Sequence, residues 1–433
     1  MKALILMALL LNMPIQQDSP KIDVIKIDGA INPVIASFIH DTLEKAKQEK
    51  TECLLIQLNT PGGLLKSTRI IVSDFLTSNI PIVVYVYPSG SQAASAGTII
   101  TLAANIAVMA PGTNIGAVHP VVMSEGNEAN KKDSTNIMME KVTNDAAAFI
   151  RSIAEKRHRN VEWAEKSVRE SLSLTETEAL KEKVIDFIAR DLNELIFKIN
   201  GIEVETASGL KTIHSKNAKL NFIEMNAFQK FLDIISDPSI AYILMMLGVY
   251  GLIFELSNPG SILPGIVGVI SLILAFYSLH TLPINYAGLA LIIFGIILFI
   301  AEIKVVSHGL LAAGGIISFL IGSLMFINTD TSTEFLSISL TVIITITILT
   351  ALFFVFAVGK GITAQRRKPT TGSEGMIGEK GVALTNFNSF SSGKVLVHGE
   401  IWDANSADSE IKEGDNIEVK AVKGLKLIIK KVD

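Results

Sequence analysis

The sequence predicts three folds in order along the chain: an α/β domain, a helical membrane domain and a small all-β barrel. Strands and helices alternate over the first half, which indicates a parallel sheet with crossover helices. Five apolar segments follow, each close to the length that a bilayer requires. Short alternating stretches with turn residues end the chain, which is typical of a barrel. A chain of 433 residues has room for two or three domains.

Residues 1–18 are predicted to be a signal peptide. Lys2 precedes an apolar stretch, Ala3–Leu11, that is too short to span a bilayer stably. The region lacks a clear Ala-x-Ala cleavage site. We expect the soluble domain to follow over residues 19–237.

The soluble domain is expected to form its sheet from strands that alternate with helices. Strands are predicted at Ile22–Ile27, Cys53–Leu58, Ile82–Tyr87 and Ile106–Met109, and helices at Asn32–Glu49, Leu64–Leu76 and Gln92–Ala104. The polar segment Met123–Asn136 breaks the pattern, and is either a mobile loop over the active site or a surface insertion. Cys53 is the only cysteine and lies in a core strand, so no intrachain disulfide can form.

A candidate nucleophile, Ser95, lies in the small-residue segment Ser91–Gly97, where a strand gives way to a helix. A hydroxyl at a helix start lies beside backbone N–H groups that have no partner within the helix. Small neighbours allow a substrate carbonyl to approach those groups. Tight packing of the helix on the sheet is the alternative explanation of the same residues.

A candidate oxyanion hole is predicted from two turns. The strand Leu54–Asn59 ends in Thr60-Pro61-Gly62-Gly63, whose glycines free backbone N–H groups to point at a ligand. The N–H of Ala96, directly after Ser95, could supply the second donor, as in other serine hydrolases. An ordinary strand-to-helix turn would have the same sequence.

Two residues could act as the base for Ser95. Lys141 lies on a helix with Val142 and Ala146 near the same face, and burial there would favour the neutral amine that a base requires. A lysine on a polar face would have no such role. His119 precedes a proline and is more typical of a structural turn, and His158, in a basic cluster, is expected at the surface.

These motifs resemble those of the ClpP-class peptidases, in particular the membrane-bound NfeD proteases. The resemblance extends over nearly the whole chain. The segments that carry it here are Thr60–Gly63, Ser91–Gly97, Asn114–Pro120 and Lys141–Glu155. One departure is His158, which stands where the family pattern has a glycine before Arg159 and Asn160.

The resemblance implies a crotonase-like spiral of βαβ units with a Ser-Lys dyad. Ser95 would be the nucleophile, Lys141 the general base, and Gly63 and Ala96 the oxyanion donors. It also implies stomatin-like membrane proteins as substrates or partners, and self-association of the catalytic domain. We expect no cofactor and no metal.

The membrane domain is predicted over residues 238–360. Its apolar segments are Ile240–Leu256, Ile262–Leu279, Ile284–Ile300, Leu310–Ile327 and Phe335–Val358. None carries an internal Lys or Arg, and five in succession argue against a buried soluble core. Glycines in Gly309–Gly322 suggest close helix packing. Glu255 and Glu302, at segment ends, either lie at the membrane interface or face a polar cavity, and neither is assigned a catalytic role.

The charges between the segments predict the orientation of the chain in the cell membrane. Lys304 and Arg366–Lys368 follow the third and fifth segments, whereas the loops His280–Pro283 and Asn328–Glu334 contain no Lys or Arg. By the positive-inside rule the protease domain is extracytoplasmic and the carboxyl-terminal domain cytoplasmic.

Residues 361–433 are predicted to form a small barrel. Its strands are expected at Gly381–Leu384, Gly393–His398, Glu400–Trp402, Asn416–Val422 and Leu425–Ile429. The segment resembles the NfeD carboxyl-terminal OB-fold domain. Its strands have few aromatic residues and its lysines are interrupted by Asp and Glu, so we expect protein docking and no nucleic acid. Trp402 is more typical of core than of a contact surface.

The sequence therefore predicts a multi-pass membrane serine endopeptidase that cleaves apolar segments of membrane proteins through an acyl-enzyme at Ser95. Its formal net charge of -4 favours neither nucleic acid nor a strongly acidic ligand. The alternative is a non-proteolytic scaffold that organises a stomatin-type membrane assembly. A third possibility, an acyl-CoA enzyme of the crotonase fold, fits poorly with a membrane anchor and a Ser-Lys pair.

Overall fold

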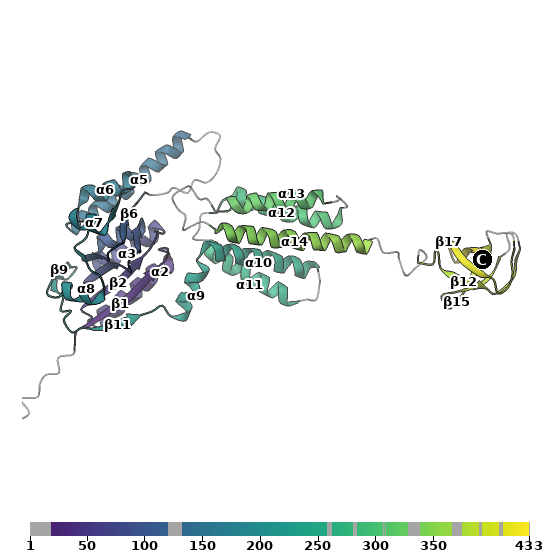
Figure 1. Ribbon diagram of the computed structural model, residues 1–433, viewed down its shortest axis with the longest axis horizontal. Coiled ribbons are helices and arrows are strands. Elements are labelled where there is room, and N and C mark those ends of the chain that lie inside the picture. Colours follow the sequence, from purple (N-terminus) through teal and green to yellow (C-terminus); the bar gives the residue numbers. More distant parts are fainter. Residues whose placement is uncertain are drawn as a thin grey trace, which may run out of the picture. The chain divides into compact units, whose positions relative to one another are not determined.

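A computed structural model gives the fold of most of the chain (Figure 1). It describes residues 19–119, 132–257, 262–279, 284–305, 307, 309–327, 338–365, 375–388, 392–406 and 410–432. The predicted signal peptide and the first part of the predicted loop, 123–131, lie outside these residues. The predicted domain boundaries therefore remain predictions, and the parts of the chain are described one by one.

The amino-terminal domain is built on a six-stranded sheet in the order β11-β1-β2-β3-β5-β8. Every pair of neighbouring strands is parallel, as the sequence predicts. The strands are β1 (Lys21–Asp28), β2 (Cys53–Asn59), β3 (Ile82–Val86), β5 (Ile106–Met109), β8 (Phe187–Ile188) and β11 (Lys219–Ile223). Two smaller sheets are formed by β4 (Gln92–Ala94), β6 (Asn114–Gly116) and β7 (Ser173–Thr175), and by β9 (Glu203–Thr206) and β10 (Gly209–Thr212).

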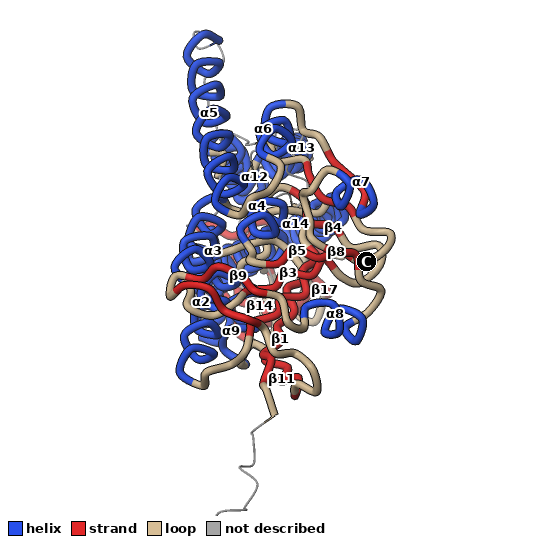
Figure 2. Tube along the Cα trace, turned by 90° about the vertical axis from the view of Figure 1, so that its left-hand side faces the viewer, coloured by secondary structure: helices blue, strands red, loops and turns tan. Residues whose placement is uncertain are grey.

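Helices cover both faces of the main sheet, because alternate strand residues are apolar on each face. Figure 2 shows α2 and α3 on one side of the strands and α8 on the other. Ile56 and Val84 pack with α2 to α6, whereas Leu55 and Val83 pack with α8. The helices are α2 (Pro33–Gln48), α3 (Leu65–Thr77), α4 (Ala96–Ala103), α5 (Lys132–Lys156), α6 (Val161–Arg169), α7 (Glu176–Lys181), α8 (Leu192–Ile199) and α9 (Ala227–Ile235).

The predicted helix Gln92–Ala104 is wrong at its start. Residues Gln92–Ala94 form β4, which pairs with Asn114–Gly116 of β6, and α4 begins only at Ala96. Pairing with a strand from a later part of the chain holds these residues extended, which their small side chains do not reveal. The last part of the predicted loop, 132–136, is likewise helical and belongs to α5.

Cys53 lies in the core, as the sequence predicts. It is fully buried in β2, and burial raises the pKa of its thiol to about 12. A thiol in this environment is neither charged nor accessible at neutral pH.

The backbone at the end of α5 explains why the family pattern has a glycine where this chain has His158. Its φ is 55°, a left-handed conformation that favours glycine, and its side chain is exposed as predicted. The next residue, Arg159, is buried and donates hydrogen bonds to the carbonyls of Leu102, Ala104 and Val184 and to the carboxylate of Asp186. The turn at His158 thus directs a buried cation to the carboxyl-terminal end of α4.

Replacement of His158 by glycine is expected to stabilise the protein. A left-handed conformation costs a non-glycine residue about 1–2 kcal/mol in the folded state. Glycine avoids this cost but makes the unfolded chain more flexible, which offsets part of the gain. We therefore expect His158→Gly to raise the free energy of unfolding by up to about 1 kcal/mol, measured by thermal denaturation in detergent. Gly112→Ala is the reverse control and should lower the free energy of unfolding, because Gly112 has a φ of 76° and an alanine there would be strained without any steric clash. A lower midpoint for His158→Gly would contradict this account.

Each of the five predicted apolar segments corresponds to a helix. These are α10 (Pro238–Ser257), α11 (Ile262–Leu279), α12 (Tyr286–Lys304), α13 (Leu310–Met325) and α14 (Leu340–Gln365). Among the described residues, α10 and α11 are long and apolar enough to cross a membrane by length and composition, and the apolar parts of the other three are shorter. A Cβ at Gly322 would lie 2.7 Å from the backbone nitrogen of Ile292, so α13 packs closely on α12, as its glycines predict.

Glu302 has a structural role at the end of α12. Its buried carboxylate accepts hydrogen bonds from the N–H groups of Gly309 and Ala312, at 2.9 and 3.1 Å, and from the hydroxyl of Ser307. These N–H groups belong to the first turn of α13, where they have no partner within the helix. Glu302 is therefore a helix cap, which satisfies a buried charge.

The carboxyl-terminal segment is a closed five-stranded barrel in the order β12-β14-β15-β18-β17. Its strands are β12 (Lys380–Ala383), β14 (Ser392–Val397), β15 (Glu400–Ser406), β17 (Asn416–Lys423) and β18 (Lys426–Lys431), and β13 (Phe387–Asn388) pairs separately with β16 (Glu410–Ile411). All five predicted strands overlap an observed one. Trp402 is half-buried and packs against the barrel core, as predicted.

Candidate active site

Ser95 occupies a sharp turn between β4 and α4. Its φ is 49° and its ψ is -110°, a combination that a serine rarely adopts. The Ser95 N–H donates to the carbonyl of Gly116 at 2.9 Å, and the Ser95 carbonyl accepts the first bond of α4 from Thr98 at 3.0 Å. The residue is partly exposed. A strained strand-to-helix turn of this kind presents the hydroxyl of a nucleophilic serine in α/β-hydrolases.

The turn after β2 lies beside this elbow because the two strands pair at Thr60 and Ala93. The N–H of Thr60 donates to the carbonyl of Gln92 at 2.8 Å, and the N–H of Ala94 donates to the carbonyl of Thr60 at 3.0 Å. Both segments then turn away from the same bridge. The pairing therefore places the turn that carries Gly63 next to the strand that leads into Ser95.

Gly63 is held by the backbone of Ile31. The Ile31 N–H donates to the carbonyl of Gly62, and the Leu64 N–H donates to the carbonyl of Ile31, both at 2.8 Å. A Cβ at Gly63 would lie 2.2 Å from the Ile31 carbonyl oxygen, so only glycine fits. Within the part of the chain that the structure describes, the N–H groups of Gly63 and Ala96 have no hydrogen-bond partner. Two such donors beside a serine are suited to bind a developing oxyanion.

Two threonines that the sequence does not mark as functional position this site. The Thr98 hydroxyl lies 2.8 and 2.9 Å from the carbonyls of Ala93 and Gly116, and it accepts a hydrogen bond from the Gly116 N–H. The Thr60 hydroxyl donates to the carbonyl of Gly62 and accepts from its N–H. Thr98 thus fixes the elbow, and Thr60 fixes the turn beside it. Thr98 bonds to Gly116, which is 18 residues away, so no local pattern identifies its role, whereas Thr60 lies within the predicted turn Thr60–Gly63.

A chain of polar groups also supports the start of β4. The Asn59 side chain accepts from the N–H of Gln92 at 3.0 Å and donates to the carboxylate of Asp28 at 2.9 Å. The hydrogen bond from the Lys26 ammonium, together with that from Asn59, lowers the pKa of Asp28. Asp28 is therefore charged at neutral pH and orients the Asn59 amide.

Lys141 is not joined to Ser95 by a hydrogen bond in the described part of the chain. It lies on α5, which packs against α4 through Ala146, Ala147 and Ile150. Because each residue turns a helix by about 100°, Lys141 lies on the face opposite Ile150, and its side chain is exposed. The burial predicted from the apolar neighbours of Lys141 is therefore wrong. A neighbouring alanine and valine do not decide which face of α5 meets the core.

An ion pair and a hydrogen bond hold α5 one turn after Lys141. Arg69 of α3 donates to Asp145 at 2.6 Å and stacks on the ring of Phe149. Arg169 of α6 donates to Asn144 at 2.9 Å. Contacts from α3 and from α6 therefore fix the part of α5 that follows Lys141.

The other predicted features around the site have structural roles or lie apart. The Nδ1 atom of His119 lies 3.1 Å from the carbonyl oxygen of Val168, in agreement with the predicted structural turn. Among the described residues, no group of three or more His, Cys, Asp or Glu side chains could hold a metal ion.

The fold and the site define a class of protein: a crotonase-like α/β domain with a strained serine elbow, followed by apolar helices and a small barrel. Three family models match consecutive parts of the chain. They are the NfeD1b N-terminal domain at residues 21–222, the NfeD integral membrane domain at 239–360, and the NfeD-like C-terminal, partner-binding domain at 373–431. The apolar helices therefore form an integral membrane domain.

Two curated relatives match nearly the whole chain. The membrane-bound protease PH1510 of Pyrococcus horikoshii is 36% identical over 406 residues, which cover 91% of this chain and 90% of the relative. The membrane protein NfeD1b of Bacillus subtilis is 27% identical over 430 residues, which cover 94% and 92%. The chain therefore belongs to the NfeD family of membrane-bound proteases.

Solved structures of one protease match about half of the chain. A lysine-to-alanine mutant of the membrane-bound stomatin-specific protease 1510-N, in complex with a substrate peptide, is 34% identical, covers 50% of this chain and 98% of its own, and has a TM-score of 0.45. A serine-to-alanine mutant of the same protease is 34% identical, covers 48% and 99%, and has a TM-score of 0.44.

The contact between Gly97 and Thr60 can be tested by a pair of substitutions. A Cβ at Gly97 would lie 2.5 Å from Cγ2 of Thr60, whose rotamer is fixed by its hydroxyl. We expect Gly97→Ala to lower the free energy of unfolding by about 1–3 kcal/mol because it overpacks the elbow. Thr60→Ser removes the methyl group and keeps the hydroxyl, so the double variant should recover about 1 kcal/mol. If the losses of unfolding free energy caused by Gly97→Ala and by Thr60→Ser simply add in the double variant, as measured by chemical denaturation, the contact is contradicted.

The role of Thr98 can be tested by the contrast between valine and serine. Thr98→Val leaves the N–H of Gly116 without its acceptor, which is expected to cost about 1–3 kcal/mol. Thr98→Ser retains the hydroxyl and should be closer to wild type. Hydrogen exchange of the Gly116 amide measures the effect locally. Equal protection of this amide in all three proteins would show that Thr98 does not hold the elbow.

Proposed function

We propose that the protein is a membrane-anchored serine endopeptidase that cleaves apolar segments of membrane proteins through a Ser-Lys dyad. The single observation that carries the proposal is the elbow at Ser95, a strained, partly exposed serine at the start of α4. We assign the N–H groups of Gly63 and Ala96 as oxyanion donors, because neither has a hydrogen-bond partner among the described residues. The relative PH1510 is a membrane-bound protease, which supports this chemistry.

In this mechanism the Ser95 hydroxyl attacks the scissile carbonyl while Lys141 accepts its proton. The negative charge that develops on the carbonyl oxygen is stabilised by the N–H groups of Gly63 and Ala96. The proton on Lys141 then passes to the leaving amine, which gives an acyl-enzyme at Ser95. Water attacks this ester, with Lys141 again as the base, and releases the acid and free Ser95.

The exposed position of Lys141 implies that the dyad forms only when substrate is bound. The proton can pass only when the two side chains meet, so substrate must cover the Lys141 amine and bring it to the Ser95 hydroxyl. An apolar peptide across the small residues around Ser95 would exclude water from the site. Catalytic hydrogen bonds that are absent without substrate and form in the complex are common in enzymes.

We propose a stomatin-like membrane protein as substrate or partner. The protease 1510-N is stomatin-specific, and the barrel here matches a partner-binding domain. We also propose that the catalytic domain self-associates. Its location outside the cytoplasm, with the barrel inside, follows from the Lys and Arg bias between the helices.

The test is cleavage of an apolar peptide library by the full chain in detergent. Ser95→Ala and Lys141→Ala are each expected to lower kcat by at least about three orders of magnitude, because each removes a group that acts in the transition state. Ser91→Ala and Lys156→Ala are matched controls from the same motif and the same helix, and they should cleave like wild type. Circular dichroism shows whether each variant is folded.

Equal cleavage by wild type, Ser95→Ala and Lys141→Ala would overturn the proposal, and so would a folded wild-type protein without any cleavage. Either result would favour the alternative, a non-proteolytic scaffold for a stomatin-type membrane assembly.

A further inference from the structure

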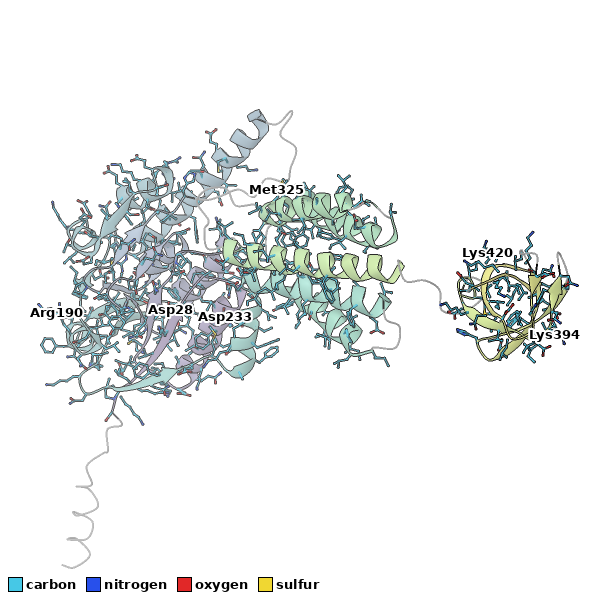
Figure 3. All side chains as sticks on the ribbon, turned by 45° about the vertical axis from the view of Figure 1, so that its right-hand side comes forward. Asp28, Arg190, Asp233, Met325, Lys394 and Lys420 are labelled. Atoms are coloured by element: carbon cyan, nitrogen blue, oxygen red, sulfur yellow. The ribbon has the colours of Figure 1, made fainter. Side chains whose placement is uncertain are left out.

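The helix α9 packs its polar face against the protein and exposes its apolar face, whereas most helices at a protein surface do the opposite. Its polar residues face the α/β domain: Asp233 accepts a hydrogen bond from the Asn32 side chain at 2.7 Å, and Gln229 donates to Asp41 at 3.3 Å. Asn32 caps α2, and Asp41 lies within it. Figure 3, in which Asp233 is labelled, shows α9 beside the α/β domain. The polar face of α9 is thus used for packing within the protein.

The apolar face of α9 is exposed. Phe228, Phe231 and Ile234 are spaced three residues apart and are 66%, 44% and 59% exposed. Side chains at this spacing share one side of a helix. An isolated exposed apolar residue is ordinary, but two phenylalanines and an isoleucine in a row on one helix indicate a surface that is covered in the working protein.

The chain itself indicates what covers this face. The helix α9 ends at Ile235, and α10, the first helix of the integral membrane domain, begins at Pro238. The carboxylate of Asp237 caps α10 by accepting from the N–H groups of Ser239 and Ile240. The end of α9 therefore lies within one turn of a membrane-spanning segment, next to the headgroup region of a bilayer.

We propose that α9 is an interfacial helix whose Phe228, Phe231 and Ile234 insert into the lipid at the membrane surface. Helices of this kind place aromatic and aliphatic side chains at the boundary between headgroups and acyl chains. The bilayer takes the place of the solvent that the apolar face would otherwise meet. Lys230, paired with Glu224 at 2.7 Å, lies on the polar side of the helix.

This arrangement would hold the serine elbow at a fixed height above the membrane. Asn32, which bonds to α9, directly follows Ile31, whose backbone brackets Gly62 and Leu64. A rigid path of hydrogen bonds thus joins the interfacial helix to the turn that carries Gly63. The pair Asn32 and Asp233 therefore links α9 to the segment that holds this turn.

The experiment uses full-length protein in vesicles of phosphatidylcholine and phosphatidylglycerol. Phe228→Cys, Phe231→Cys and Ile234→Cys are each labelled with the fluorophore NBD, and a second set of vesicles contains lipid with a nitroxide near the top of its acyl chain. Cys53 is buried and does not compete for the label while the protein is folded. The matched control is Phe197→Cys on α8, an 83% exposed phenylalanine on the helix that packs on the opposite face of the sheet.

We expect NBD at positions 228, 231 and 234 to emit at shorter wavelength than at 197 and to be quenched by the lipid nitroxide several times more strongly. Emission like that of the control at all three positions would show that the face is in water and overturn the proposal. Emission at shorter wavelength without nitroxide quenching would also overturn it, since protein, such as a second copy of this chain, would then cover α9.

Discussion

The site depends on the bridge between Thr60 at the end of β2 and Ala93 in β4. Two backbone hydrogen bonds there place the turn Thr60–Gly63 beside the elbow at Ser95. Without the bridge, neither the strained serine nor the glycine would have a defined position, because each is held by backbone contacts from elsewhere in the chain. The close approach of Gly97 to Thr60 and of Gly63 to Ile31 leaves no room for a Cβ at either glycine.

Much of this site can be predicted from sequence, because small residues and glycines mark places where backbones approach closely. The segment Ser91–Gly97 indicates the elbow, and the turn after β2 indicates the second donor. The start of α4 cannot be predicted, since β4 is extended only through its pairing with Asn114–Gly116. The exposure of Lys141 is readable only from the whole of α5: the spacing of Ala146, Ala147 and Ile150 marks the buried face and places Lys141 opposite it, whereas Val142 alone does not mark that face.

The domains divide the proposed work of the enzyme. Backbone pairing of β4 with β6 and with Thr60 holds the proposed nucleophile and the turn of a proposed oxyanion donor, whereas the proposed base is exposed on α5 and would have to be brought to Ser95 by substrate. The interfacial helix proposed here would limit which peptides reach Ser95, since it ties the turn at Gly63 to the membrane surface. Selectivity for apolar segments would then arise from location as well as from the small residues around the elbow.

The most direct test of the central claim is the site at which a serine-directed fluorophosphonate reacts with the full-length protein. Attack by the Ser95 hydroxyl displaces fluoride and leaves a phosphonyl ester, which mass spectrometry of proteolytic fragments can locate. The account predicts a single adduct at Ser95, because its strained backbone presents the hydroxyl next to the N–H groups of Gly63 and Ala96. An adduct at another serine, or none in folded protein, would contradict it.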